Sequence, residues 1–141
     1  MNIDKTVESS YQLKNIRLVE TLFKFPVVFP LDNLSIQIKN EPRTIDENII
    51  CQLKVLLSQT NEDKEFKMEI TMEGIFEKKG EDKLSHTEFE QISAPSIIYP
   101  YIRQQVRYLS LEAGLNAIIL PVINFQAFHQ SNIAQKSDTP K

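Results

Sequence analysis

The sequence predicts an α+β fold in which a four-stranded antiparallel sheet is followed by two main helices. Apolar and polar residues alternate with a period of two along much of residues 11–77, which is the pattern of strands with one buried face. From residue 95 onward the apolar residues recur every three or four positions, as in a helix. Strands that precede helices in this way are typical of the α+β class. A chain of 141 residues suits a single domain, 1–141, in which segments 1–9 and 137–141 are expected to be flexible.

Two strands are predicted in the N-terminal part of the chain. Residues 11–25 form one strand with a change of phase, which a β-bulge or a bend produces. Its apolar residues fall on one face at first and then on the other, namely Tyr11 and Leu13, followed by Ile16, Leu18 and Leu22. Residues 34–39 form a second, short strand. Residues 40–46 are predicted to be a loop, because proline at position 42 donates no hydrogen bond to a sheet.

The next two strands carry the clearest pattern and form a predicted hairpin around a turn at 60–63. The first covers 49–58, and its inward residues are Ile49, Cys51, Leu53, Val55 and Leu57. The second covers 65–77, and its inward residues are Phe66, Met68, Ile70, Met72 and Phe76. The alternate positions of the second strand are expected to face water, namely Glu65, Lys67, Glu69, Thr71, Glu73 and Glu77.

The second half of the chain is predicted to hold a short helix at 84–92 and a long one that starts near Pro95 or Pro100 and ends at Gly114. The long helix has two apolar stripes. One consists of Ile98, Ile102, Val106, Leu109 and Ala113, and the other of Ile97, Tyr101, Tyr108 and Leu111. Only a narrow edge is polar, namely Arg103, Arg107 and Ser110. A helix with two apolar stripes is expected to be covered on both sides, either inside a domain or between its own sheet and another subunit.

An apolar connector follows the long helix at 115–125. It is too short to cross a membrane and has neither helical nor strand periodicity, so it must pack on something or offer a surface to something. Asn124 is a predicted N-cap for a last helix that runs to about Gln135.

Composition argues against several classes of function. A net charge of −3 is unsuited to nucleic acid, and three glycines leave too few for a phosphate-binding loop. The single cysteine, Cys51, fits a reducing cytoplasm and is expected to be a small buried hydrophobe. No signal peptide is visible at the N-terminus. His86 and His129 are too isolated to form a metal site, so we expect no metal, no cofactor and no catalytic residue.

Four segments of the chain resemble the SecB export chaperones. Residues 96–103, SIIYPYIR, are similar to the family segment NILFPYAR, and residues 120–128, LPVINFQAF, are similar to LAPVNFDALF. Residues 66–76, FKMEITMEGIF, resemble the strand FLCEVQQGGIF, and residues 11–16, YQLKNI, resemble FQIQRI. The similarity extends in patches over most of the chain.

This resemblance implies a SecB-like fold and an ATP-independent holdase that binds unfolded or pre-export polypeptides in a hydrophobic groove. By position, the client-binding residues are Leu115, Ile118, Ile119, Leu120, Val122, Phe125 and Phe128, to which Phe25 and Phe29 are added. The family also assembles as a dimer of dimers with the long helices between two sheets. A homotetramer would use the second stripe, which is Ile97, Tyr101, Tyr108 and Leu111.

In the SecB family, the SecA motor docks on an acidic patch of the exposed sheet face. Glu20 and Glu69 stand where the family has acids, but Lys24 replaces a further acid and Lys67 replaces a leucine. Each lysine should repel a basic partner, which argues against strong SecA docking. Three alternatives stay open: a SecB-like chaperone dedicated to one antitoxin, a small apolar ligand carrier or enzyme with a closed pocket, and a structural subunit that docks one fixed partner through its acidic strand face.

Overall fold

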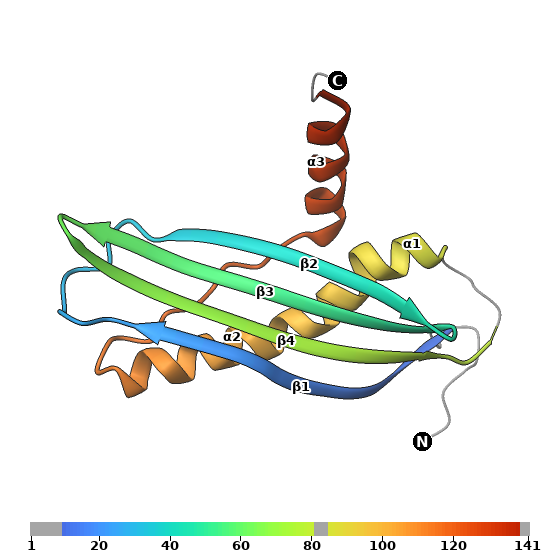
Figure 1. Cartoon of the computed structure of the whole chain (residues 1–141), viewed down its shortest axis with the longest axis horizontal. Helices are drawn as coiled ribbons and strands as arrows, with labels where there is room; N and C mark the ends of the chain where they lie inside the picture. The colour runs from blue at the N-terminus through green and yellow to red at the C-terminus, as the bar shows by residue number, and fades with distance from the viewer. Residues whose placement is uncertain (1–9, 81–84, 139–141) are drawn as a thin grey trace.

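The computed structural model describes residues 10–80 and 85–138. Segment 1–9, Leu84 and residues 139–141, for which we made predictions above, lie outside this part of the chain. Four long strands come first and the helices follow (Figure 1). The strands are β1 (Tyr11–Lys24), β2 (Ser35–Ile45), β3 (Asn48–Asn61) and β4 (Lys64–Lys78). The helices are α1 (His86–Glu88), η1 (Phe89–Ser93), α2 (Ala94–Glu112) and α3 (Phe125–Asp138). The predicted α+β class is confirmed.

The strands form one antiparallel sheet in the order β1-β4-β3-β2. The predicted hairpin of β3 and β4 is present, and its turn includes Glu62 with a φ of 59°. A second tight turn joins β2 to β3 through Asp46 and Glu47, both with positive φ, which is the geometry that suits the twist of a hairpin. The two central strands, β3 and β4, therefore have partners on both sides, whereas β1 and β2 are edges.

The predicted change of phase in β1 is present, but the strand has two irregularities instead of one. The pairing with β4 shifts between Leu13 and Asn15 and again between Leu18 and Glu20. The second shift returns the strand to its first phase. As a result Leu22 pairs with Glu69 on the outer face of the sheet and does not share a face with Ile16, so this part of the prediction is wrong.

The predicted loop at 40–46 is wrong, because β2 continues through Pro42 to Ile45. Pro42 pairs with Cys51 of β3, and a proline is tolerated here because β2 is an edge strand.

The core lies between the inner face of the sheet and α2, which crosses behind the sheet in Figure 1. The ten inward residues predicted for β3 and β4 are all buried. The first stripe of α2 packs on them through Ile98, Ile102 and Val106. A glycine, Gly74, lies at the point of contact, where an added Cβ would come within 3.0 Å of Ile98 Cδ1. The sheet and helix thus meet too closely at this point to leave room for a side chain.

The outer face of β4 is only partly in contact with water, which corrects the prediction for Thr71 and Glu73. Glu73 is 3% exposed, because its carboxylate accepts hydrogen bonds from Arg17 Nε at 3.1 Å and Gln52 Nε2 at 2.7 Å. Arg43 of β2 lies 3.7 Å from the same carboxylate. Burial alone would raise the pKa of Glu73, but the hydrogen bonds and the two arginine charges outweigh burial and lower the pKa.

The short helix predicted before the long one is instead continuous with it. A single turn, α1, leads into the π-helical η1 and then into α2. Pro95 lies in the first turn of α2 as expected, but Pro100 lies inside the helix. Ser110 was predicted to be on the polar edge and is buried, where its hydroxyl donates to the Val106 carbonyl at 2.6 Å.

Gly114 ends α2 in the predicted way, with a φ of 77°. The Gly114 amide donates to the Leu111 carbonyl and the Leu115 amide donates to the Ser110 carbonyl, which is the pairing of a Schellman motif. Asn124 caps α3 by accepting from the Ala127 amide at 3.1 Å. α3 ends at Asp138, beyond the expected end at Gln135, and it extends away from the sheet past β2 (Figure 1). No helix within the described residues is long and apolar enough to cross a membrane.

Candidate functional site: the apolar connector and its grooves

The connector between α2 and α3, residues 113–124, is fixed to the rest of the protein by a few anchors. The hydroxyl of Tyr99 on α2 donates a hydrogen bond to the Pro121 carbonyl at 2.6 Å. Burial raises the pKa of Tyr99, against the opposing charge of Arg103, so the hydroxyl stays protonated as a donor. Leu120 and Phe125 are 1% and 3% exposed, and the rings of Tyr99 and Phe125 pack edge to face at 5.6 Å. These contacts hold an extended segment in one position.

Two large apolar side chains of the connector remain in water despite these anchors. Ile119 is 69% exposed and Val122 is 84% exposed, on either side of the Leu120–Pro121 anchor. Single exposed apolar residues are common, but two on one anchored segment next to apolar hollows make this segment the candidate binding surface.

The connector is flanked by two open apolar hollows. The larger, of about 530 Å³, lies between the connector and the β1–β2 loop, and its lining residues are Val28, Phe29, Pro30, Leu31, Leu34, Leu115, Asn116, Ala117 and Ile118. The smaller, of about 280 Å³, lies between the connector and α2, and its lining residues are Pro100, Arg103, Gln104, Arg107, Ile118, Ile119 and Leu120. Because Ile118 lines both, we treat them as one surface and call it the connector groove.

The β1–β2 loop forms the far wall of the connector groove. Phe25 packs edge to face against Phe29 at 5.1 Å and against Phe66 of β4 at 5.0 Å, so an aromatic cluster ties the loop to the core. Phe29 is itself buried, while Val28 beside it is exposed. Of the two phenylalanines added to the predicted site, Phe29 lines the groove. Phe25 is not among the lining residues but packs against Phe29.

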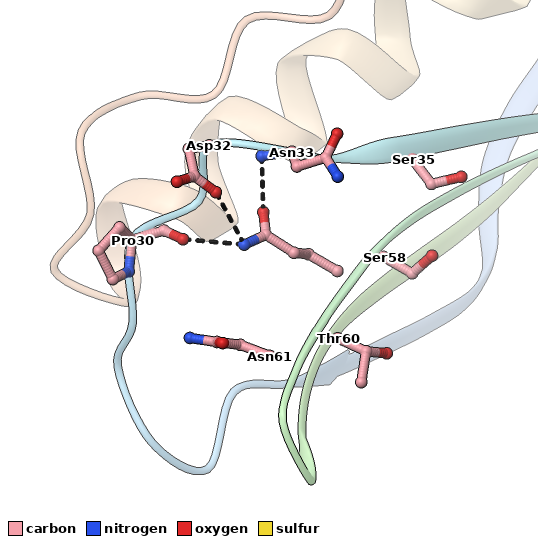
Figure 2. A pocket seen from close by; sticks show the side chains of 8 residues that line it. Pro30, Asp32, Asn33, Ser35, Ser58, Thr60 and Asn61 are labelled. Atoms are coloured by element: carbon pink, nitrogen blue, oxygen red, sulfur yellow. Dashed lines mark hydrogen bonds between the residues drawn. The ribbon is translucent and has the colours of Figure 1, made fainter.

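A glutamine of β3 fixes the other end of this loop. Gln59 Nε2 donates to the Pro30 carbonyl at 2.9 Å and to Asp32 Oδ1 at 3.3 Å, and its Oε1 accepts from the Asn33 amide at 3.0 Å. Figure 2 shows these three hydrogen bonds as dashed lines that reach Pro30, Asp32 and Asn33. They border a third hollow of about 470 Å³, which is lined by polar residues apart from Pro30, and Pro30 also lines the connector groove. Gln59 therefore positions the loop that forms the groove wall.

The structure divides the predicted client-binding residues into two groups. Leu115, Ile118, Ile119 and Val122 line the groove or face water beside it, and Leu120 also borders the smaller hollow although its side chain is buried. Leu120 and Phe125 are buried, and Phe128 is half-buried against Phe125 at 5.9 Å. The second group holds the connector in place. Of the loop wall, only Phe29 was predicted. Its neighbours Val28, Pro30, Leu31 and Leu34 were not, although the apolar run VVFPL at 27–31 is, like the connector, neither strand nor helix in pattern.

The second stripe of α2 faces away from the core. Ile97, Tyr101, Tyr108 and Leu111 are all exposed, although each is large and apolar or aromatic.

The outer sheet face carries the residues of the predicted docking patch. Glu20 is exposed, whereas Glu69 forms an ion pair with Lys54 at 3.1 Å. The hydrogen bond and charge of Glu69 raise the pKa of Lys54. Lys24 and Lys67 are directly opposite each other on β1 and β4. The face therefore mixes charges of both signs, with two lysines at one end.

His86 and Cys51, which were considered for metal binding or nucleophilic chemistry, both have hydrogen-bond partners within the fold. His86 contacts the Tyr11 hydroxyl at 3.0 Å, the Thr44 hydroxyl at 2.7 Å and Glu90 at 2.7 Å. Burial, with the charge of Glu90, raises the pKa of Cys51 to about 12, and its thiol donates to Asn40 Oδ1 at 2.9 Å. Within 10–80 and 85–138 no group of three or more potential ligands is arranged to hold a metal ion.

The chain is similar in sequence to a known protein family and to individual members of it. Residues 22–136 match the family model described as SecB, preprotein translocase subunit SecB. The protein-export protein SecB of Azoarcus sp. (strain BH72) is 31% identical over 106 residues, which are 73% of this chain and 70% of that protein. The protein-export protein SecB of Alcanivorax borkumensis is 26% identical over 137 residues, which are 89% of this chain and 87% of that protein.

A solved structure shares the fold. It is a SecB-like chaperone of Mycobacterium tuberculosis in complex with an antitoxin peptide, with a TM-score of 0.66 and 19% identity over 81% of this chain and 88% of that one. The matched family and these relatives are named for a role in protein export. The chain belongs to the SecB family of preprotein translocase subunits.

Proposed function

We propose that this protein is an ATP-independent holdase that binds unfolded or pre-export polypeptides along the connector groove. The observation that supports this most directly is the exposure of Ile119 and Val122 on a segment that Tyr99, Leu120 and Phe125 hold still. A preformed apolar surface binds extended chains of many sequences through area and many weak contacts. Because native proteins have buried their apolar segments, such a surface binds the unfolded state selectively and holds it there by mass action.

The open shape of the groove favours a polypeptide over a small ligand. Both hollows are about half-open to solvent, whereas a site for a small apolar molecule usually buries most of the ligand's surface. An extended chain can pass along an open groove and leave at both ends.

We also propose that the protein assembles as a dimer of dimers through the second stripe of α2. Exposed Ile97, Tyr101, Tyr108 and Leu111 would be buried there between two sheets. The single buried thiol, Cys51, suits the reducing cytoplasm, where we propose that the protein works.

Transfer of clients to SecA would be weak in this proposal. Glu69 already has Lys54 as a partner, and Lys24 and Lys67 are opposite each other beside it. A basic partner would meet repulsion at that end of the sheet. A chaperone dedicated to one client, such as an antitoxin, is therefore the second candidate, and a SecA-binding assay on the purified protein separates the two.

The holdase proposal is tested by suppression of aggregation of a chemically unfolded client. We expect Val122→Asp and Ile119→Asp each to remove most of the suppression, because a charge in the groove must be desolvated when the client binds. Both side chains are exposed, so the fold should persist, as circular dichroism would verify. Ile45→Asp, at the far end of β2, is the matched control and should retain full suppression. Unchanged suppression by both groove variants would refute the assignment.

A further inference from the structure

Gln59 is a polar residue on the inner face of the sheet. It continues the series of inward positions on β3 that is apolar from Ile49 to Leu57, and it pairs with Phe66 of β4, which is buried. Gln59 is itself half-buried. Burial of an amide is favourable only where its hydrogen bonds are made, so the partners of Gln59 indicate why a polar residue ends this series.

The side-chain amide of Gln59 is used entirely on the β1–β2 loop. Its Nε2 donates to the Pro30 carbonyl at 2.9 Å and to Asp32 Oδ1 at 3.3 Å, which takes up both N–H donors. Its Oε1 accepts from the Asn33 amide at 3.0 Å, and Figure 2 shows all three bonds meeting at this one side chain. One residue of β3 therefore binds three positions of the loop.

These bonds are the polar attachment of the groove wall. Among the residues that the structure describes, no other hydrogen bond reaches 26–33, and the backbone pairing of β2 with β3 begins only at Ser35. The other end of the loop is held by the packing of Phe25 on Phe29. Without Gln59 the wall would be held by apolar contacts, which are not directional.

We propose that Gln59 is a positioning residue of the holdase, which keeps the connector groove formed before a client arrives. This rests on the holdase function proposed above and adds a determinant of its affinity. Ordering a loop when a ligand binds costs free energy, and a loop that is already fixed avoids this cost. Val28 on the same loop is 71% exposed and lines the larger hollow, so Gln59 also fixes an apolar side chain that a client can contact.

The test measures binding of fluorescently labelled lactalbumin, kept unfolded by reduction and carboxymethylation, to the full chain by fluorescence anisotropy. Gln59→Ala removes all three bonds. We expect it to weaken binding about five- to tenfold and to speed hydrogen–deuterium exchange in residues 26–34. Gln59→Glu keeps the acceptor for Asn33 but sets a carboxylate against the Pro30 carbonyl and Asp32, and should weaken binding to a similar extent. Asp32→Asn added to Gln59→Glu returns a donor, and this double variant should bind roughly threefold tighter than Gln59→Glu alone.

Thr60→Ala is the matched control. Thr60 lines the same polar hollow, but its hydroxyl forms no hydrogen bond to the described residues of the loop, so its loss should leave both affinity and exchange unchanged. Urea denaturation of each variant shows that binding is measured on folded protein. If Gln59→Ala does not fold, the comparison of Gln59→Glu with the double variant decides the question.

The outcomes separate this inference from the holdase function. Failure of the unmodified chain to bind the client would overturn both. A Gln59→Ala protein that binds as tightly as the unmodified chain would overturn the role of Gln59 and leave the holdase function standing. The same holds if the double variant binds no better than Gln59→Glu. An equal loss of affinity in Thr60→Ala would show that the polar hollow itself contacts the client, and would likewise refute a positioning role.

Discussion

Replacement of Gly74 by alanine should destabilise the protein, because Gly74 is where the sheet and α2 come closest. An added Cβ would lie 3.0 Å from Ile98 Cδ1 and 3.0 Å from Phe76 Cε2, and both neighbours are buried. Overpacking of this kind costs about 1–3 kcal/mol. Alanine recovers roughly 0.5–1 kcal/mol of the conformational penalty that glycine has in a strand. The net loss of unfolding free energy should therefore be about 1–2 kcal/mol, measured by urea denaturation at a fixed protein concentration.

Two companion variants make this prediction specific. Gly80→Ala is the matched control, because a Cβ there meets no atom within 4 Å, and its effect should stay within about 0.5 kcal/mol. Ile98→Val removes the Cδ1 atom that the new methyl group would meet. Alone it should cost about 1 kcal/mol, but in the Gly74→Ala background it should cost less than half of that. Strictly additive losses, or a Gly74→Ala protein as stable as Gly80→Ala, would refute the close-contact explanation.

Three further predictions follow from individual contacts. Glu73 has a lowered pKa when folded, so its charge stabilises the protein at neutral pH and this contribution is lost as pH falls through the native pKa. Glu73→Gln should cost about 1–2 kcal/mol at pH 7 and progressively less as the pH is lowered below 4.5. A cost in urea denaturation that does not change over this pH range would contradict the prediction. Tyr99→Phe removes the hydrogen bond to Pro121 and should speed amide exchange in the connector by roughly five- to tenfold, with strand amides unchanged as the internal control. The Cys51 thiol should react with a disulfide reagent only after unfolding, since burial raises its pKa to about 12, and rapid modification of the native protein would show that the site opens.

The central hairpin was predicted correctly because its residues need no information from distant parts of the chain. The inward positions of β3 and β4 follow from alternation alone, and all ten are buried. Gly114 and Asn124 were also predicted from local chemistry, since a positive φ and a side-chain cap are properties of single positions.

The errors arise where distant residues decide the outcome. Pro42 is compatible with a strand only because β2 is at the edge of the sheet, and strand order is not visible in local sequence. Glu73 looks like the other acids of β4, but Arg17, Gln52 and Arg43, from the three other strands, cover it.

The candidate site was likewise predicted only in part, because distant contacts decide some of its features. An apolar connector was evident from composition, but Ile119 and Leu120 are chemically alike and adjacent. The structure places one in water and buries the other, because Tyr99 fixes the connector beside it through Pro121. Apart from Phe29, the loop wall of the groove was not predicted, because its contact with the connector joins segments far apart in sequence.

Mass in solution, measured by light scattering with and without a permanently unfolded client, tests the central claim most directly. We predict a particle of about four 16.3 kDa chains that gains mass when the client is added, and a Val122→Asp protein that forms the same particle without gaining mass. A monomer that ignores the client, or a Val122→Asp protein that binds it as well as the unmodified chain, would contradict a holdase that works through the connector groove.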